Sequence, residues 1–278
     1  MSSKCIYFDL DGTLISNCTG ITNRTLMAIN YLKSKGVRIG IATGRSLFSS
    51  FNIAKTIGVN MPIICANGAW IIHQDDFTTI NSKYIDSKTQ YKIIKMLRLS
   101  NKDFIVYTHS GIYTTNSSLD FFKKLDKTHD AIKKNQQSNL SLMYEVKEVN
   151  DVKFFLEENI FNIIVPYEGI TEKIELEKTL KNLGTVNFAF SSFSCIVDIF
   201  SSEADKGKAI KTVIDSLRIN KWDVTVFGDN ENDINMFRMF PSSVALKNAE
   251  YNIREQAKYV TDFTCDQEGV ADYIFKNF

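Results

Sequence analysis

Aspartates follow two apolar segments that lie far apart in this chain of 278 residues. They are Asp9 and Asp11, after the apolar run 5–8, and Asp229 and Asp233, after the apolar run 224–227. Clustered carboxylates repel one another unless a cation neutralises them. No histidine or cysteine joins these residues, so the expected ligands are all oxygen atoms, which favours Mg²⁺ over zinc or copper.

Other segments add groups that suit an anion. Thr43 and Gly44 precede a predicted helix and offer a hydroxyl and an exposed amide, and Lys206 adds a positive charge at the start of another helix. Carboxylates, magnesium and a lysine together indicate phosphoryl transfer. One aspartate would attack phosphorus to form an aspartyl-phosphate that water hydrolyses. Magnesium and Lys206 would neutralise the transferring oxygens, and a second carboxyl group would protonate the leaving oxygen and then activate the water.

These side chains need a scaffold that brings distant segments together. The first third of the chain alternates strands at 5–8, 37–42 and 63–65 with helices that begin at Thr22 and Ser46. This β-α-β-α-β order predicts a parallel, right-handed, doubly wound sheet. The carboxyl ends of parallel strands share one edge, where ligands bind, so we expect the polar groups to meet there.

The pattern changes near residue 84. A hairpin is expected from the segments 104–109 and 112–115, and strands at 186–190 and 195–200; helices are expected at 119–134 and 171–183. The βα alternation then resumes with strands at 224–227, 243–246 and 259–261. We therefore predict an α/β protein whose core, residues 1–83 plus 201–278, is interrupted by an α+β insertion at 84–200 that serves as a lid.

Composition excludes several classes of function. The chain is 44% hydrophobic and 23% charged with a net charge of +1, so no strong field favours nucleic acid or an acidic membrane. No apolar run approaches the roughly 20 residues of a bilayer span, and no signal peptide precedes Asp9. The five cysteines are scattered and form no CxxC pair, which is typical of free thiols in a reducing compartment. We expect a cytoplasmic protein; the oligomeric state is not indicated.

Four motifs, in order, resemble those of the haloacid dehalogenase superfamily. They are Asp9-Leu10-Asp11-Gly12-Thr13-Leu14, Ala42-Thr43-Gly44-Arg45, Lys206-Gly207 and Gly228-Asp229-Asn230-Glu231-Asn232-Asp233. Three further segments are similar to its Cof-type branch (subfamily IIB) of sugar-phosphatase-like hydrolases: Ala66-Asn67-Gly68-Ala69, Val244-Ala245-Leu246-Lys247-Asn248-Ala249 and Glu268-Gly269-Val270-Ala271. The resemblance covers both flanking segments, whereas the middle matches only in length and element order. It implies a Rossmann-like core with a C2-type cap between the second and third motifs.

The resemblance also implies a role for each motif residue. Asp9 would be the nucleophile and a Mg²⁺ ligand, and Asp11 the general acid/base and a ligand through its backbone carbonyl. Asp229 would complete the protein ligands, with Asp233 in or near the metal's second shell, orienting water or Lys206. The phosphate would be held by Thr43, Gly44, Lys206, Asn232 and the amide of Leu10. The implied partner is a small phosphorylated metabolite, a sugar phosphate at the family level, with flavin or pyridoxal phosphates as alternatives.

Other interpretations stay open at this point. A phosphomutase would use the same aspartyl-phosphate, and a non-catalytic sensor would bind Mg²⁺ and a phosphometabolite. The sensor is disfavoured because Asp11 and Lys206 are both present. Asn67-Gly68 is typical of a hairpin turn and is interpreted as structural, with contact to the substrate as the lesser alternative.

Overall fold

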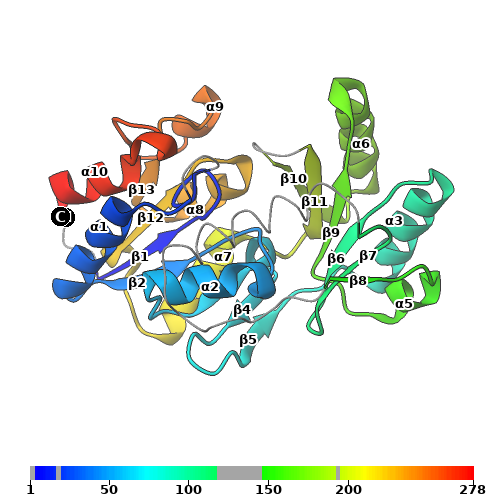
Figure 1. Cartoon of the computed structure of the whole chain (residues 1–278), viewed down its shortest axis with the longest axis horizontal. Coiled ribbons are helices and arrows are strands. Elements are labelled where there is room, and N and C mark those ends of the chain that lie inside the picture. The colour runs from blue at the N-terminus through cyan, green and yellow to red at the C-terminus, as the bar shows by residue number, and fades with distance from the viewer. Residues whose placement is uncertain (1–3, 17–19, 118–145, 192–194) are drawn as a thin grey trace.

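The computed structural model describes residues 4–16, 20–117, 146–191 and 195–278. The helix expected at 119–134 lies outside these ranges. Figure 1 shows two lobes, a core built from the N-terminal (blue) and C-terminal (orange and red) elements and a cap built from the middle of the chain. The prediction of a Rossmann-like core with an inserted α+β cap is therefore confirmed, whereas the residue-level boundaries at 83/84 and 200/201 stay a prediction. Within the described ranges, no helix combines the length and the apolar composition of a membrane span.

The core is a sheet of five strands, and every paired strand in it runs parallel to its neighbour. In spatial order the strands are β14 (Tyr259–Val260), β13 (Ser242–Ala245), β12 (Val224–Gly228), β1 (Cys5–Phe8) and β2 (Arg38–Ile41). Because β1 lies between β12 and β2, its carboxyl end stands beside the ends of two strands that come from opposite ends of the sequence. This neighbourhood is what brings the predicted site residues together.

Helices cover both faces of the core sheet. Ile6 and Phe8 pack with α1 (Asn23–Ser34) and α10 (Gly269–Asn277), whereas Cys5 and Tyr7 pack with other helices on the opposite face. Those are α7 (Lys206–Ser216), α8 (Ile234–Met239) and α9 (Tyr251–Arg254). Successive side chains of a strand point to opposite faces, so a strand that is apolar throughout must be covered on both sides.

Local sequence signals set the ends of the first helices. Thr22 caps α1, where its side chain accepts a hydrogen bond from the backbone amide of Thr25. Ser46 caps α2 (Leu47–Ile57) in the same way, and Gly58 ends that helix with a left-handed φ of 65°. Both predicted helix starts are confirmed, and Ser46 begins α2 directly after the predicted phosphate-binding loop.

The third predicted strand behaves differently from expectation. Within the described residues, β3 (Ile63–Cys65) pairs with the core sheet through a single isolated parallel bridge between Ala42 and Ile64. Its ladder is antiparallel, in a separate sheet with β4 (Trp70–Ile72) and β5 (Thr79–Ser82). The connection from β3 to β4 is the 3₁₀ helix η1 (Ala66–Gly68), which confirms the hairpin expected at Asn67-Gly68.

The cap is a six-stranded sheet with helices on the face turned away from the core (Figure 1). Its strands in spatial order are β10 (Val186–Phe190), β11 (Ile196–Ser201), β9 (Asn162–Pro166), β6 (Ile105–Tyr107), β7 (Ile112–Thr114) and β8 (Val146–Glu148), and its helices are α3 (Ser87–Leu99), α5 (Val152–Glu157) and α6 (Gly169–Leu183). The predicted hairpin of β6 with β7 is confirmed as antiparallel, and the two predicted strands β10 and β11 also pair antiparallel. Among the strand pairs of the described cap residues, β7 with β8 is the one parallel pair, and this largely antiparallel sheet with its helices makes the cap α+β.

Candidate active site

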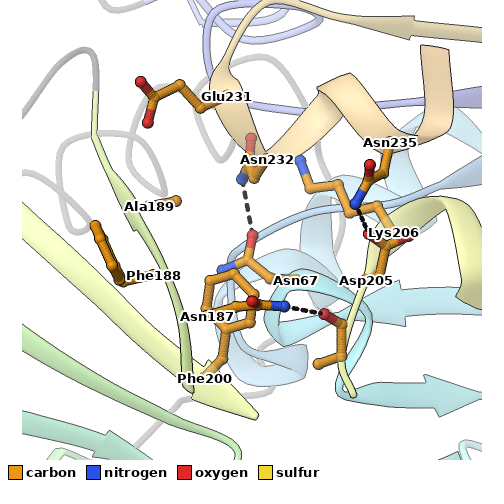
Figure 2. Close-up of a pocket in the computed structure, with 11 residues that line it drawn as sticks. Asn67, Asn187, Phe188, Ala189, Phe200, Asp205, Lys206, Glu231, Asn232 and Asn235 are labelled. Carbon is orange, nitrogen blue, oxygen red and sulfur yellow. Dashed lines mark hydrogen bonds between the residues drawn. The ribbon is translucent and has the colours of Figure 1, made fainter. Parts of the chain in front are cut away.

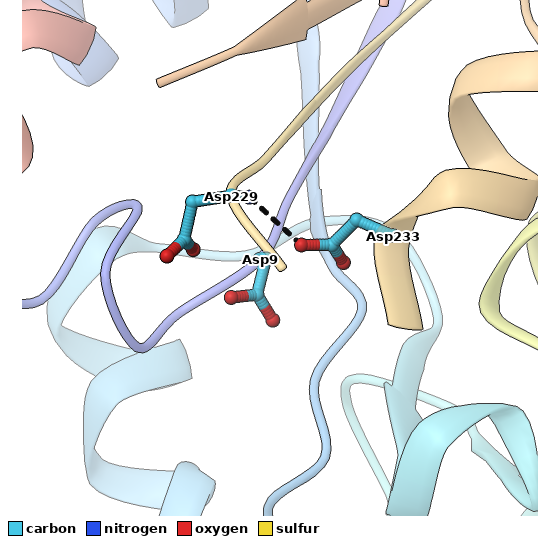
Figure 3. A group of neighbouring side chains, drawn as sticks. All are labelled: Asp9, Asp229 and Asp233. Atoms are coloured by element: carbon cyan, nitrogen blue, oxygen red, sulfur yellow. Dashed lines mark hydrogen bonds between the residues drawn. The ribbon is translucent and has the colours of Figure 1, made fainter. Parts of the chain in front are cut away.

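Three aspartates meet at the carboxyl edge of the core sheet. Asp9 follows β1, and Asp229 and Asp233 follow β12, the latter at the end of the 3₁₀ helix η3 (Glu231–Asp233). One carboxylate oxygen from each lies within 4.8 Å of the others, and all three residues are buried (Figure 3). The structure thus brings together carboxylates that are more than 200 residues apart in the sequence, as parallel strand ends predict.

Lys206 lies directly against this cluster. It begins α7, and Asp205 caps that helix by accepting from the amide of Lys208. The Lys206 ammonium donates to Asp9 Oδ1 at 2.6 Å and to Asp233 Oδ1 at 2.7 Å, with its side chain fully buried. Burial alone would lower the pKa of Lys206, but the Asp233 and Asp9 carboxylates outweigh burial and raise it above its ordinary value.

Asp233 has both oxygens engaged by the protein. Its Oδ2 accepts from the backbone amides of Asp229 and Asn230 at 2.8 and 3.0 Å, while Oδ1 accepts from Lys206. A Cβ at Gly228 would lie 2.5 Å from the Asp233 carboxyl carbon, so only glycine leaves room for this carboxylate. The geometry therefore suits Asp233 to fixing the loop and Lys206, where the resemblance also places it.

Asp229 is held by two side chains that were not predicted as site residues. Thr13 Oγ1 donates to Asp229 Oδ1 at 2.9 Å, and Asn248 Nδ2 donates to Oδ2 at 3.3 Å. Asn248 also donates to the backbone carbonyl of Gly12 at 2.9 Å, which ties the loop after β1 to the loop after β13. Both residues lie inside the matched motifs, and that position is the signal that could have identified them.

The cluster carries an uncompensated negative charge. When ionised, the three carboxylates and the Lys206 ammonium sum to a net charge of −2. Burial, with repulsion from Asp233, raises the pKa of Asp9 to about 7 despite Lys206. Burial and repulsion from Asp9 and Asp233 raise the pKa of Asp229 well above its ordinary value. A divalent cation would supply the missing charge, and a buried oxygen donor set is what Mg²⁺ binds, so the residues present fit this ion.

Asp11 stands apart from the cluster and forms a clamp with Arg45. The guanidinium donates to both carboxylate oxygens, Nε to Oδ2 at 2.7 Å and Nη2 to Oδ1 at 2.6 Å. Burial opposes ionisation of Asp11, but Arg45 prevails and holds its pKa below the ordinary value. Arg45 lies within a predicted motif, but the sequence predicts no role for it. Its pairing with Asp11, 34 positions away, depends on where the two loops lie.

The predicted phosphate-binding residues lie around the same edge. Thr43 is buried, and its backbone amide donates to the carbonyl of Ile64 at 2.9 Å. Leu10 is fully buried, and Gly44 lies beneath the side chain of Asn67. Asn232 Nδ2 donates to Asn67 Oδ1 at 2.7 Å, which joins η3 to η1 (Figure 2).

A cavity of about 150 Å³ opens beside Lys206, between the core and cap strands β10 and β11. Figure 2 shows that amide side chains line it together with apolar groups of the cap. The core contributes Asn67, Ala204, Asp205, Lys206, Glu231, Asn232 and Asn235, and the cap contributes Asn187, Phe188, Ala189 and Phe200. No sequence motif identified the cap residues, since they come together only when the cap folds over the core.

Comparisons with known proteins agree with this geometry. The family model for haloacid dehalogenase-like hydrolases matches residues 6–274. The phosphatase YwpJ of Bacillus subtilis is 29% identical, with 96% of this chain and 97% of YwpJ covered. The 5-amino-6-(5-phospho-D-ribitylamino)uracil phosphatase YwtE of the same organism is 27% identical, with 98% of this chain and 96% of YwtE covered.

Solved structures show the same fold. The sugar phosphatase BT4131, of subclass IIB of the superfamily, superposes with a TM-score of 0.82 at 21% identity, covering 99% of this chain and 98% of BT4131. The family match spans nearly the whole chain, and the relatives found across its length are phosphatases. The chain therefore belongs to the haloacid dehalogenase-like hydrolases, in their Cof-type branch, and is a phosphoric monoester hydrolase.

Proposed function

We propose that this chain is a Mg²⁺-dependent phosphatase that hydrolyses small phosphomonoesters through an aspartyl-phosphate on Asp9. The observation that carries the proposal is the buried cluster of Asp9, Asp229 and Asp233 with Lys206, whose net charge of −2 suits a divalent cation and, through it, a phosphate. Asp9 and Asp229, with the backbone carbonyl of Asp11, would hold the ion. When bound, Mg²⁺ would neutralise charge on the phosphoryl oxygens.

The chain's own residues supply the remaining chemistry. An oxygen of Asp9 attacks phosphorus, and the bond from phosphorus to the ester oxygen breaks. Asp11 protonates that departing oxygen and afterwards takes a proton from the water that hydrolyses the aspartyl-phosphate. Lys206, Thr43 and the other predicted phosphate-binding residues hold the phosphoryl group.

The Arg45 clamp places a condition on the proton donor. A carboxylate bound bidentately by a guanidinium is stabilised in its ionised form. Asp11 must therefore leave this contact and take up a proton from solvent before it can donate that proton to the departing oxygen. Its side chain is 42% exposed, which leaves it free to do so.

Small phosphorylated metabolites, sugar phosphates among them, are the proposed substrates. YwtE is named for a phosphoribityl compound and BT4131 as a sugar phosphatase, and a small cavity lined by amides suits a hydroxylated leaving group. The cytoplasmic location stays a prediction.

The proposal is tested with purified Asp9→Asn and p-nitrophenyl phosphate. We expect at least about a 1,000-fold loss of kcat, because the amide cannot act as the nucleophile. Asp75→Asn makes the same chemical change on the surface and should retain full activity. EDTA should abolish turnover by the unmodified protein, and added MgCl₂ should restore it. Retained activity in Asp9→Asn would refute the nucleophile assignment, and full activity in EDTA would refute the metal requirement.

A further inference from the structure

Asp198 is a charged residue of the cap sheet on the face turned towards the core. Along β11, Val197 and Ile199 pack with the cap helices, whereas Ile196 and Phe200 belong to the cluster that faces the core. Side chains alternate across a strand, so Asp198 lies on the core-facing side between two apolar neighbours. A carboxylate at this position loses hydration, which costs free energy unless a hydrogen-bond donor or a cation pairs with it.

The surroundings of Asp198 place it at the active site. Its neighbours across the sheet are Ala189 of β10 and Ile164 of β9, and the small alanine side chain leaves space beside it. On the core side, a Cβ at Gly44 would lie 3.3 Å from Asp198 Oδ2, so the cap carboxylate reaches the loop predicted to hold the phosphate. Among the described residues, no lysine or arginine forms a salt bridge with it. Burial raises the pKa of Asp198 to about 7, although the Asn67 amide and Lys206 act to lower it.

Asn67 offers a complementary group at the same place. The Cβ position of Gly44 that lies near Asp198 is 3.1 Å from Asn67 Oδ1 and 3.3 Å from its Nδ2. Asn67 is 1% exposed, and its Nδ2 lies close enough to the Asp198 carboxylate to lower the pKa of that group, yet it makes no well-directed hydrogen bond to any described residue. Its orientation is set by a left-handed φ of 56° and by Asn232, which donates to its Oδ1. A buried donor that no acceptor engages in good geometry is costly unless a ligand satisfies it, so a ligand atom between Asn67 and Asp198 would be stabilised.

We propose that Asp198 and Asn67 together bind a hydroxyl group of the substrate's leaving group and so determine specificity. This inference rests on the proposed phosphatase function. A hydroxyl both accepts and donates, so it can accept from Asn67 Nδ2 and donate to an Asp198 oxygen. The phosphoryl group is not the ligand of this pair, because the Asp198 carboxylate would repel it. The pair therefore binds the part of the substrate beyond the ester oxygen, and favours polyol phosphates over alkyl phosphates.

The test compares kcat/KM for D-ribitol 5-phosphate and n-pentyl phosphate, which match in chain length and differ in hydroxyls, at pH 8 with MgCl₂. We expect the unmodified protein to prefer ribitol 5-phosphate by at least about 10-fold. Asp198→Ala should reduce this preference by about 10- to 100-fold, because a hydrogen bond to a charged group is lost. Asp198→Asn keeps an acceptor oxygen and should reduce the preference for ribitol 5-phosphate by less. Glu157→Ala removes an exposed carboxylate from α5 and should leave the preference unchanged.

The possible outcomes separate this inference from the function beneath it. An equal loss of kcat/KM for both probes in Asp198→Ala would show that the residue only seats the cap, and would overturn the inference. The absence of any preference in the unmodified protein would do the same. Failure of the unmodified protein to hydrolyse p-nitrophenyl phosphate would instead overturn the proposed function, and this inference with it.

Discussion

Replacing Lys206 by methionine tests the electrostatic account of the site. The substitution keeps most of the side-chain volume and removes the ammonium that lies 2.6 Å from Asp9 and 2.7 Å from Asp233. The net charge of the ionised cluster then changes from −2 to −3. Removing one partner of a buried ion pair costs about 3–5 kcal/mol, because the remaining charges stay buried without compensation. At roughly 2–4 °C per kcal/mol for a chain of this size, the melting temperature should fall by about 6–20 °C.

The loss of stability in Lys206→Met should depend on pH, in a direction that the pKa of Asp9 sets. The pKa of Asp9 is already raised to about 7, and Lys206 is a group that lowers it, so the variant raises it further. In the unfolded chain the pKa of an aspartate is about 4. When the folded state has a higher pKa, the free energy of unfolding falls as the pH rises from the unfolded to the folded pKa, because the unfolded chain ionises first. The difference in melting temperature between the variant and the unmodified protein should therefore widen from pH 5 to pH 8.

The assay is thermal unfolding, followed by circular dichroism, in EDTA at both pH values. Lys208→Met is the matched control, because it makes the same change two residues further along α7 at an exposed position. We also expect at least about a 100-fold loss of kcat/KM in Lys206→Met alone. If Lys206→Met and Lys208→Met have the same melting temperature at both pH values, the buried-charge reasoning is wrong.

Two further predictions concern the same cluster. Addition of MgCl₂ to metal-free protein should raise its melting temperature, by roughly 5–11 °C at 100 times the dissociation constant, because the ion binds the folded cluster; an unchanged melting curve would contradict the metal site. Gly228→Ala should destabilise the protein by about 1–3 kcal/mol and lower kcat, because the added Cβ would displace Asp233 and with it Lys206. Denaturant unfolding measures the stability, and turnover measures kcat. An unaltered kcat would show that Asp233 need not stay in place.

Local sequence predicted the parts of the fold that depend on neighbours along the chain. Thr22 and Ser46 begin their helices and Gly58 ends one, because caps act within a few residues. The all-apolar segment 5–8 could only be a strand covered on both faces. The strand β9 was missed, although it lies between β11 and β6 in the cap sheet, because a short apolar run does not reveal its partners.

The active site likewise contains features that the sequence predicts and features that depend on the folded loops. Asp9 and Asp229 were predicted to meet because both follow strands of a parallel sheet, whose carboxyl ends share an edge whatever their separation in sequence. The Asp11–Arg45 clamp and the bond from Thr13 to Asp229 were not predicted, because they depend on how individual loops turn after those strands. β3 was expected within the parallel sheet, yet pairing with β4 across a tight turn prevailed.

The sequence by itself predicted the chemistry that we propose for this protein, since the types, order and spacing of the motif residues predicted carboxylates, a lysine and a phosphate-binding loop at one sheet edge. Only the tertiary structure decided what lies opposite that edge. The alternation of β11 places Asp198 on one face of the cap sheet, but which core residues that face meets depends on how the two lobes pack. Packing between lobes joins residues with no local relation, which is why the position of Asp198 beside Asn67 and Gly44 required the folded chain.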